Sequence, residues 1–207
     1  MRTASGSEKL QPSPVEGKVG KMEQKAQRSG PDDPNSRLIQ ILDERGYPTE
    51  PLSPVSPLYV TVPTEEMTKD YDRDFISVVR SGDLESLRAF RERGRNMNAC
   101  NKFGESLLHL AMRMGNLETV QFMVESGAWL LVCDDYGRTP LHDACWCPQA
   151  PFDLVKIVLD QHNDSLLVKD RRGFTPLSYV QPERWETWCT FLETVKDKYW
   201  PRRVNIG

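Results

Sequence analysis

Apolar residues recur at three- and four-residue spacing from about residue 70 towards the C-terminus. The stretch "FISVVRSGDLESLRAF" at 75–90 is a clear example. This spacing places apolar side chains on one face of a helix, so it predicts short amphipathic helices. Glycines interrupt the pattern at regular places and separate the helices into pairs. The core positions expected on the second helix of each pair are Leu84, Leu87, Phe90, Leu117, Val120, Met123, Leu154, Ile157 and Val158.

The helical pattern repeats along the chain with an offset of 33 residues. Residues 81–111 align with residues 114–144 by this offset. A further copy begins at 169–180, and three extra residues in 146–153 precede it. A fixed period of this length indicates stacked copies of one supersecondary unit. We therefore expect a solenoid of helix-turn-helix units.

A short motif recurs within each unit. Residues 137–144 read "GRTPLHDA", and weaker copies are "GESLLHLA" at 104–111 and "GFTPLSYV" at 173–180. With this motif and period, the chain resembles the ankyrin repeat family over about four units, roughly residues 71–198. The resemblance implies an all-α ankyrin-repeat solenoid with β-turn tips. The first and last units are irregular, as expected of capping repeats.

The motif residues have clear local roles. Thr139 lies where a helix N-cap is needed, and Pro140 takes the first helical position, where a missing N–H costs nothing. The corresponding residues of neighbouring units are Ser106, Thr175 and Pro176. By the resemblance, His109 and His142 are structural residues that hydrogen-bond the start of their helix to neighbouring turns.

The chain before the repeats has a different composition. Residues 1–35 are rich in Pro, Ser, Gly and charge, which predicts a disordered tail. Residues 36–70 form a Pro-rich linker with a possible short helix. Asn35 or Ser36 would cap that helix, which either docks on the folded part or acts as a binding motif. Its shared apolar face holds Leu38, Ile41 and Leu42. The repeat domain is expected at 71–200 and a C-terminal tail at 201–207.

Charge and hydropathy narrow the function classes. The net charge of −3 gives no support for a nucleic-acid binder, which would show a basic stripe. The longest apolar runs, such as 128–133, are far short of the roughly 20 residues of a spanning helix, so we expect no membrane segment. The N-terminal stretch has no apolar signal region, and the five cysteines are interpreted as reduced thiols. A cytoplasmic location, with the nucleus as the alternative, follows.

The segment "HDACWC" at 142–147 raises the question of a reactive site. His142, Cys145 and Cys147 could bind zinc, but a structural site needs four ligands at recognisable spacing. Cys145 with His142 could form a nucleophile and base, yet cysteine hydrolases take these partners from distant segments. We therefore expect no catalytic residue, no metal site and no cofactor, and the protein is predicted not to be an enzyme.

The most direct functional hypothesis is a protein-binding module or adaptor. Stacked repeats form an extended concave surface from turn tips and first helices, and we expect a monomer that binds another protein there. The alternative is a regulatory protein that acts through a linear motif in 35–62 and uses the repeats as a scaffold. The candidate partner-binding residues are Phe103, Glu105, Met112, Arg113, Tyr136, Arg138, Trp146, Arg172 and Phe174.

Overall fold

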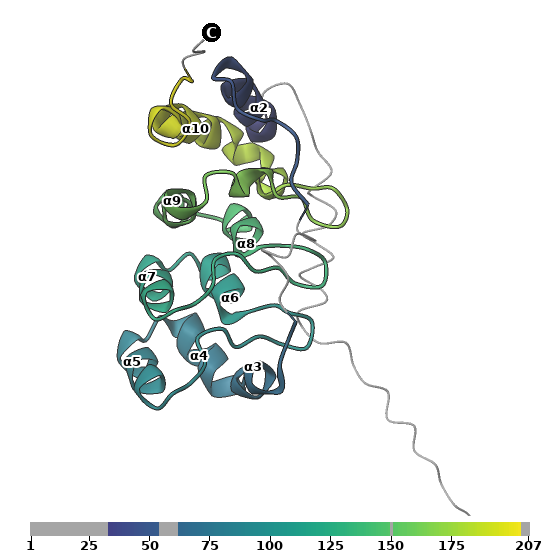
Figure 1. The fold of residues 1–207 in the computed structure, drawn as a ribbon. Helices are drawn as coiled ribbons and strands as arrows, with labels where there is room; N and C mark the ends of the chain where they lie inside the picture. The colour runs from purple at the N-terminus through teal and green to yellow at the C-terminus, as the bar shows by residue number, and fades with distance from the viewer. Residues whose placement is uncertain (1–32, 54–61, 150, 204–207) are drawn as a thin grey trace, which may run out of the picture.

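The computed structural model describes residues 33–53, 62–149 and 151–203. In these residues the chain is helical, and its extended pairing is limited to two isolated β-bridges. The all-α solenoid of paired helices is confirmed (Figure 1). Of the tail predicted to be disordered at 1–35, residues 1–32 lie outside the described part, whereas residues 33–35 cap and begin α2. The helices are α2 (Pro34–Glu44), α3 (Glu65–Asp70), α4 (Arg73–Ser81), α5 (Leu84–Glu92), α6 (Leu107–Met114), α7 (Leu117–Glu125), α8 (Pro140–Trp146), α9 (Phe152–Gln161) and α10 (Trp185–Tyr199), with 3-10 turns η1 (Ser165–Leu167), η2 (Pro176–Tyr179) and η3 (Pro182–Arg184).

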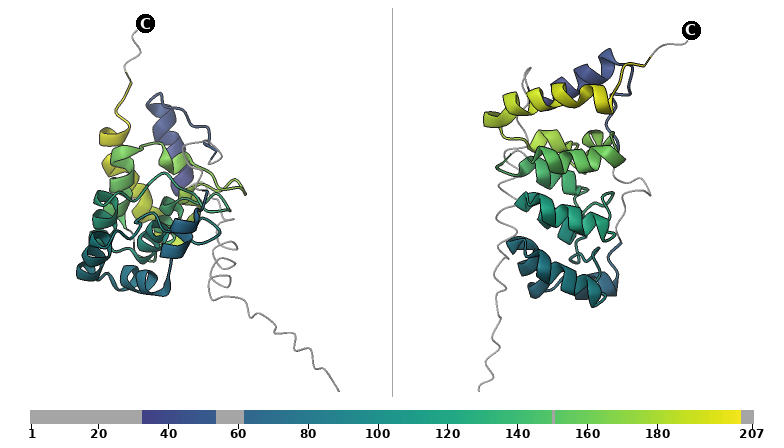
Figure 2. Two further views of the ribbon diagram at one scale, coloured as in Figure 1. Left: turned by 60° about the horizontal axis from the view of Figure 1, so that its bottom comes forward. Right: turned by 90° about the vertical axis from the view of Figure 1, so that its left-hand side faces the viewer.

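The helices form two parallel rows. An inner row runs α4, α6, α8 and η2, and an outer row runs α5, α7, α9 and α10 (Figures 1 and 2). The inner elements pack on one another in succession, and α4, α6 and α8 also pack on their outer partners α5, α7 and α9. The stack therefore has four units, and each unit contacts mainly its neighbours, as expected of a solenoid.

Helix boundaries follow from local sequence. The Asp72 carboxylate accepts a hydrogen bond from the Phe75 N–H at 2.9 Å and begins α4. Gly82 ends that helix with φ of 71°, in the left-handed region that favours glycine. A Cβ atom at Gly82 would also lie 2.2 Å from the Asn116 side chain, so the position needs glycine for two reasons. In the next unit Gly115 ends α6 in the same way, with φ of 74°, and Ser106 caps the start of that helix.

The predicted core positions of the outer helices lie at the core of the stack. Leu87, Val120, Met123, Leu154 and Val158 are buried. The others are partly buried and pack against the same core: Leu84, Phe90, Leu117 and Ile157.

Aromatic packing closes the fourth unit. Pro182 begins the 3-10 turn η3, and α10 starts three residues later. Trp188 is fully buried, and the Phe191 ring stacks on Phe152 of the preceding unit with centroids 4.3 Å apart. The aromatic stripe of α10 is therefore core rather than exposed surface.

The N-terminal helix α2 docks at the C-terminal end of the stack. It packs on α10 and η2, at the end opposite α3 and α4 (Figure 1). Leu38, Ile41 and Leu42 are each at most 2% exposed. The predicted cap was wrong: Asp33 accepts from the backbone of residues 35 and 36, because Pro34 fits the first helical position. The folded body therefore begins well before residue 71.

Polar contacts fix α2 in place. Its Asn35 amide donates to the Ser178 hydroxyl at 2.8 Å and accepts from the Thr175 hydroxyl at 2.5 Å. Ser178 occupies the position held by histidine in the two preceding units, where that histidine contacts the next turn. The fourth unit has no following turn, so α2 supplies its hydrogen-bonding partner. The buried Arg45 guanidinium completes the contact by donating to the Trp200 carbonyl at 2.9 Å.

Described residues on either side of 54–61 contact different units of the stack. The Leu52 N–H donates to the Leu167 carbonyl at 2.8 Å, and the Lys169 N–H donates to the Leu52 carbonyl at 2.9 Å. Further along, the Cys100 N–H donates to the Met67 carbonyl at 3.2 Å. Segment 33–70 therefore contacts both ends of the solenoid.

None of the helices in the described ranges has both the length and the apolar character needed to cross a membrane.

Candidate functional site

Three turns project from the same edge of the stack, and we call residues 101–105, 134–138 and 170–174 the tip row. The Asp135 N–H donates to the Phe103 carbonyl at 2.7 Å, and the Arg171 N–H donates to the Tyr136 carbonyl at 2.9 Å. These bonds join each tip to the next. The tip row is therefore a continuous ridge across the second, third and fourth units.

The first residue of each tip shapes its turn. The Asp134 carboxylate accepts hydrogen bonds from the N–H groups of Tyr136 at 3.0 Å and Arg138 at 2.8 Å. Asn101 and Asp170 accept the equivalent bonds in the other two tips. Short Asn and Asp side chains favour such turns because they bond their own backbone two residues on. The sequence places Asp134 in a turn but predicts no hydrogen-bonding role for these side chains, although their recurrence in successive units is a usable signal.

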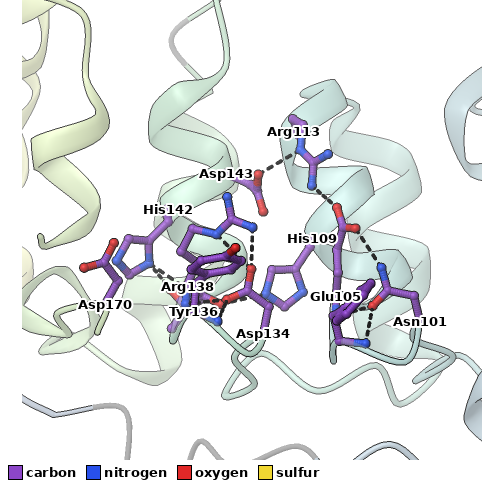
Figure 3. Close-up of polar contacts among 12 residues, drawn as sticks. Asn101, Glu105, His109, Arg113, Asp134, Tyr136, Arg138, His142, Asp143 and Asp170 are labelled. Carbon is purple, nitrogen blue, oxygen red and sulfur yellow. Dashed lines mark hydrogen bonds and ion pairs between the residues drawn. The ribbon is translucent and has the colours of Figure 1, made fainter. Parts of the chain in front are cut away.

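Two buried histidines tie the third-unit and fourth-unit tips to the preceding inner helix (Figure 3). His142 Nδ1 accepts from the Thr139 N–H at 3.0 Å, so the neutral ring carries its proton on Nε2 and donates to the Phe174 carbonyl at 3.2 Å. His109 makes the equivalent bonds to the Ser106 N–H and the Arg138 carbonyl. Burial lowers the pKa of His142 to about 4. With both ring nitrogens engaged inside the protein, His142 is placed for structure rather than catalysis.

Ion pairs between units occupy the inner face. Arg113 bridges Glu105 of its own unit and Asp143 of the next, with Nε 2.8 Å from the Asp143 carboxylate (Figure 3). The Asp143 charge is the largest influence that raises the pKa of Arg113. Burial alone would raise the pKa of Asp143, but the Arg113 charge holds it below its usual range. Arg113 and its two carboxylates are therefore neutralised within the stack.

Several predicted contact residues are not available to a partner. Met112 is fully buried between neighbouring helices, so its assignment to the binding surface was wrong. Glu105 and Arg138 are also buried, and Arg138 pairs with Asp134, whose carboxylate is 2.8 Å from Nε. The two charged residues pair within their own unit, Glu105 with Arg113 and Arg138 with Asp134, whereas Met112 is covered by neighbouring helices.

Other predicted residues lie on or near the surface. Phe103 is 50% exposed and Tyr136 is 45% exposed, at equivalent positions of adjacent tips. Arg172 holds the third equivalent position and is also exposed. Phe174 occupies the position that the buried Glu105 and Arg138 hold in the other two tips. It is therefore only partly exposed, and its ring packs on the core under the Arg172 guanidinium. Trp146 is partly buried against the core.

The Cys-rich segment after α8 has a structural explanation. Burial raises the pKa of Cys145 far above its ordinary value, so its thiol is not a nucleophile at neutral pH. Arg184 donates to the carbonyls of Cys145 and Cys147, which satisfies the end of α8 where the insertion begins. Over the described ranges, no group of three or more His, Cys, Asp or Glu residues could hold a metal ion.

Comparison with known families adds an independent finding. A family model for ankyrin repeats matches residues 75–170 in 3 copies. A comparison with curated proteins gave no match. The matched region contains α4 to α9 and the first two tips.

Proposed function

The chain is an ankyrin repeat protein, and from this premise we propose that it is a non-enzymatic module that binds another protein along the tip row and the adjoining inner face. Ankyrin repeats generally mediate protein–protein interaction. A repeat scaffold does not name its partner, so the binding face must be argued from the residues it exposes.

One observation carries the proposal: two aromatic rings are exposed at equivalent positions of adjacent tips. Most aromatic side chains of the stack pack in or against the core, whereas Phe103 and Tyr136 remain about half exposed. Exposed aromatic side chains lose little conformational entropy on binding and dominate interface energies. Neighbouring exposed rings on a rigid ridge are therefore a suitable anchor for a partner.

The tip row is also rigid enough for recognition. Backbone bonds join the tips, and His109 and His142 tie them to the helices behind. A preformed surface pays less ordering entropy when a partner binds. The same bonds keep the exposed rings on one ridge.

The test is quantitative capture of partners from the native cell with a Phe103→Ala/Tyr136→Ala variant. Proteins that bind through the tips should be depleted at least tenfold relative to the unchanged chain. Trp129→Ala is the matched control, because Trp129 is 55% exposed but lies outside the tip row, after α7. Equal recovery with the tip variant and with the control would reject the tip row as the binding face.

The linear-motif alternative has less support. The apolar residues that would anchor such a motif, Leu38, Ile41 and Leu42, are buried against the fourth unit. A motif in this segment would have to leave the stack before it could bind. We therefore place the partner-binding function on the repeats.

We further propose that the protein acts as a monomer in a reducing compartment, the cytoplasm or the nucleus. None of the five cysteines, all of which lie in described residues, forms a disulfide. Cys100 and Cys145 are buried, and burial raises the pKa of each thiol. Thiols of this kind suit a reducing environment.

A further inference from the structure

The exposed charges of the tip row are predominantly positive. Lys102, Arg171 and Arg172 are exposed, whereas Asp135 is the exposed acidic residue of the three tips. The other acidic residues at the base of the tips are buried: Glu105, Asp134 and Asp170. The ridge thus shows positive charge on a chain whose net charge is −3.

Two of these positive charges are available to a ligand. Lys102 and Arg171 form no ion pair with another described residue, and the Lys102 amine lies 4.9 Å from the centre of the Phe103 ring. Arg172 differs, because it contacts the buried Asp170 carboxylate at 3.2 Å. The unpaired cations are therefore at the second-unit tip and the fourth-unit tip.

The chemistry of the ridge also changes from the second-unit tip to the fourth-unit tip. The equivalent position of successive tips holds Phe103, then Tyr136, then Arg172. One end therefore offers aromatic rings and the other offers two guanidinium groups, Arg171 and Arg172. Arginine suits carboxylate ligands because its planar fork of donors matches the two carboxylate oxygens.

The spacing of the tips fits an extended peptide. Neighbouring tips are about one helix diameter apart, roughly 10 Å. A chain in the extended polyproline II conformation rises about 3.1 Å per residue with three residues per turn, so every third residue faces the ridge and meets a successive tip. A ligand that matches the ridge has two apolar or aromatic residues, three positions apart, for the second-unit and third-unit tips. Its acidic residues begin three positions later and meet the fourth-unit tip.

We propose that the tip row binds an extended acidic peptide segment, with its apolar residues at Phe103 and Tyr136 and its carboxylates at Arg171 and Arg172. This inference rests on the proposed function and specifies the chemistry of the partner. A nucleic acid fits less well. Its phosphates need a continuous basic stripe, whereas the tip between the two cationic ends carries Asp135.

The test measures binding of a labelled synthetic peptide by fluorescence anisotropy. The peptide has about twelve residues, with Phe at its third and sixth positions, Glu at its ninth and tenth, and Ser or Gly elsewhere. A matched peptide replaces both Glu residues with Gln, and a labelled single-stranded oligonucleotide of mixed sequence is a third ligand. We expect the Glu peptide to bind at least tenfold more tightly than the Gln peptide, with an affinity that falls as salt is raised.

Charge reversal on the protein supplies the second half of the test. Arg171→Glu should weaken binding of the Glu peptide at least tenfold and leave binding of the Gln peptide within twofold. Arg88→Glu is the matched control, because it makes the same charge change at an exposed position of the outer helix α5. This control should bind the Glu peptide like the unchanged chain.

Three outcomes overturn the inference: no binding of the Glu peptide, equal binding of the Glu and Gln peptides, or an oligonucleotide that binds through Lys102 and Arg171 more tightly than the peptide. The proposed function fails separately. The Phe103→Ala/Tyr136→Ala variant can lose captured proteins even if the synthetic peptide does not bind. That combination would support the tip row as the binding face and reject an acidic peptide as its ligand.

Discussion

At the residue scale, buried polar side chains of the inner face align each unit with the next. Arg113 joins Asp143 across 30 residues of sequence, and His109 joins the Arg138 carbonyl across 29. Each contact links one unit to the next. Because burying an unpaired charge or donor is costly, these pairs select one register of stacking.

His142 makes stability depend on pH. Burial lowers its pKa to about 4 in the folded chain, against about 6.5 when unfolded. The unfolded chain therefore binds a proton that the folded chain excludes, and the stabilisation present above pH 6.5 is lost as pH falls towards 4. A lowering of the His142 pKa from about 6.5 to about 4 corresponds to about 3 kcal/mol.

The measurement is urea unfolding at a series of pH values for the unchanged chain and for His142→Gln. Glutamine does not titrate, and its amide can still donate towards the Phe174 carbonyl. We expect the variant to be less stable at pH 7 but to lose less stability between pH 6.5 and 4. Asp143 and Asp170, whose pKa values are lowered, act below this window. Parallel pH profiles for the two proteins would show that His142 is not responsible.

At the element scale, α2 is the feature that departs most from a simple repeat. It buries three aliphatic side chains against α10 and η2, and its Asn35 occupies the hydroxyl groups of Thr175 and Ser178. The fourth unit has only a 3-10 turn as its inner helix, because Pro182 follows closely. An unusually short last unit is thus completed by a helix from the N-terminal segment.

Ile41→Ala tests this docking. Ile41 is 2% exposed, so its truncation should lower the free energy of unfolding by about 2–4 kcal/mol. Ile39→Ala on the same helix is the control, because Ile39 is 36% exposed and its truncation should cost less than about 1 kcal/mol. Denaturant unfolding measures both, and equal small losses would mean that α2 does not stabilise the stack in solution.

The repeat elements could be predicted from sequence, whereas α2 docking could not. Helix pairs, turns and most core positions follow from a local period, and the motif at 137–144 identifies the unit. The apolar face of α2 was visible too, but its binding site lies more than 130 residues away along the chain. The tip rings were found because exposure follows turn position. Glu105 and Arg138 were misplaced because each pairs with an opposite charge of its own unit, and Met112 because neighbouring helices cover it.

At the scale of the whole molecule, segment 33–70 changes how the ends of the solenoid are held. A repeat array with contacts only between neighbours loses its end units first. Here the fourth unit is covered by α2, and the same segment contacts the first unit through Met67. Both ends therefore depend on one stretch of chain, which should make unfolding of the fourth unit coincide more closely with unfolding of the rest.

Amide hydrogen exchange measures this coupling directly. We expect a chain that begins at residue 62 to exchange its η2 and α10 amides at least tenfold faster than a chain that begins at residue 33. Exchange in α6 and α7 should change much less, because neither helix contacts α2 and local opening is reported segment by segment. Acceleration shared equally by all units would instead show that the stack already unfolds as a single cooperative body, whereas unchanged exchange in α10 would show that its aromatic core with α9 closes the solenoid without α2. The comparison thus decides whether the N-terminal segment is part of the repeat fold or only lies against it.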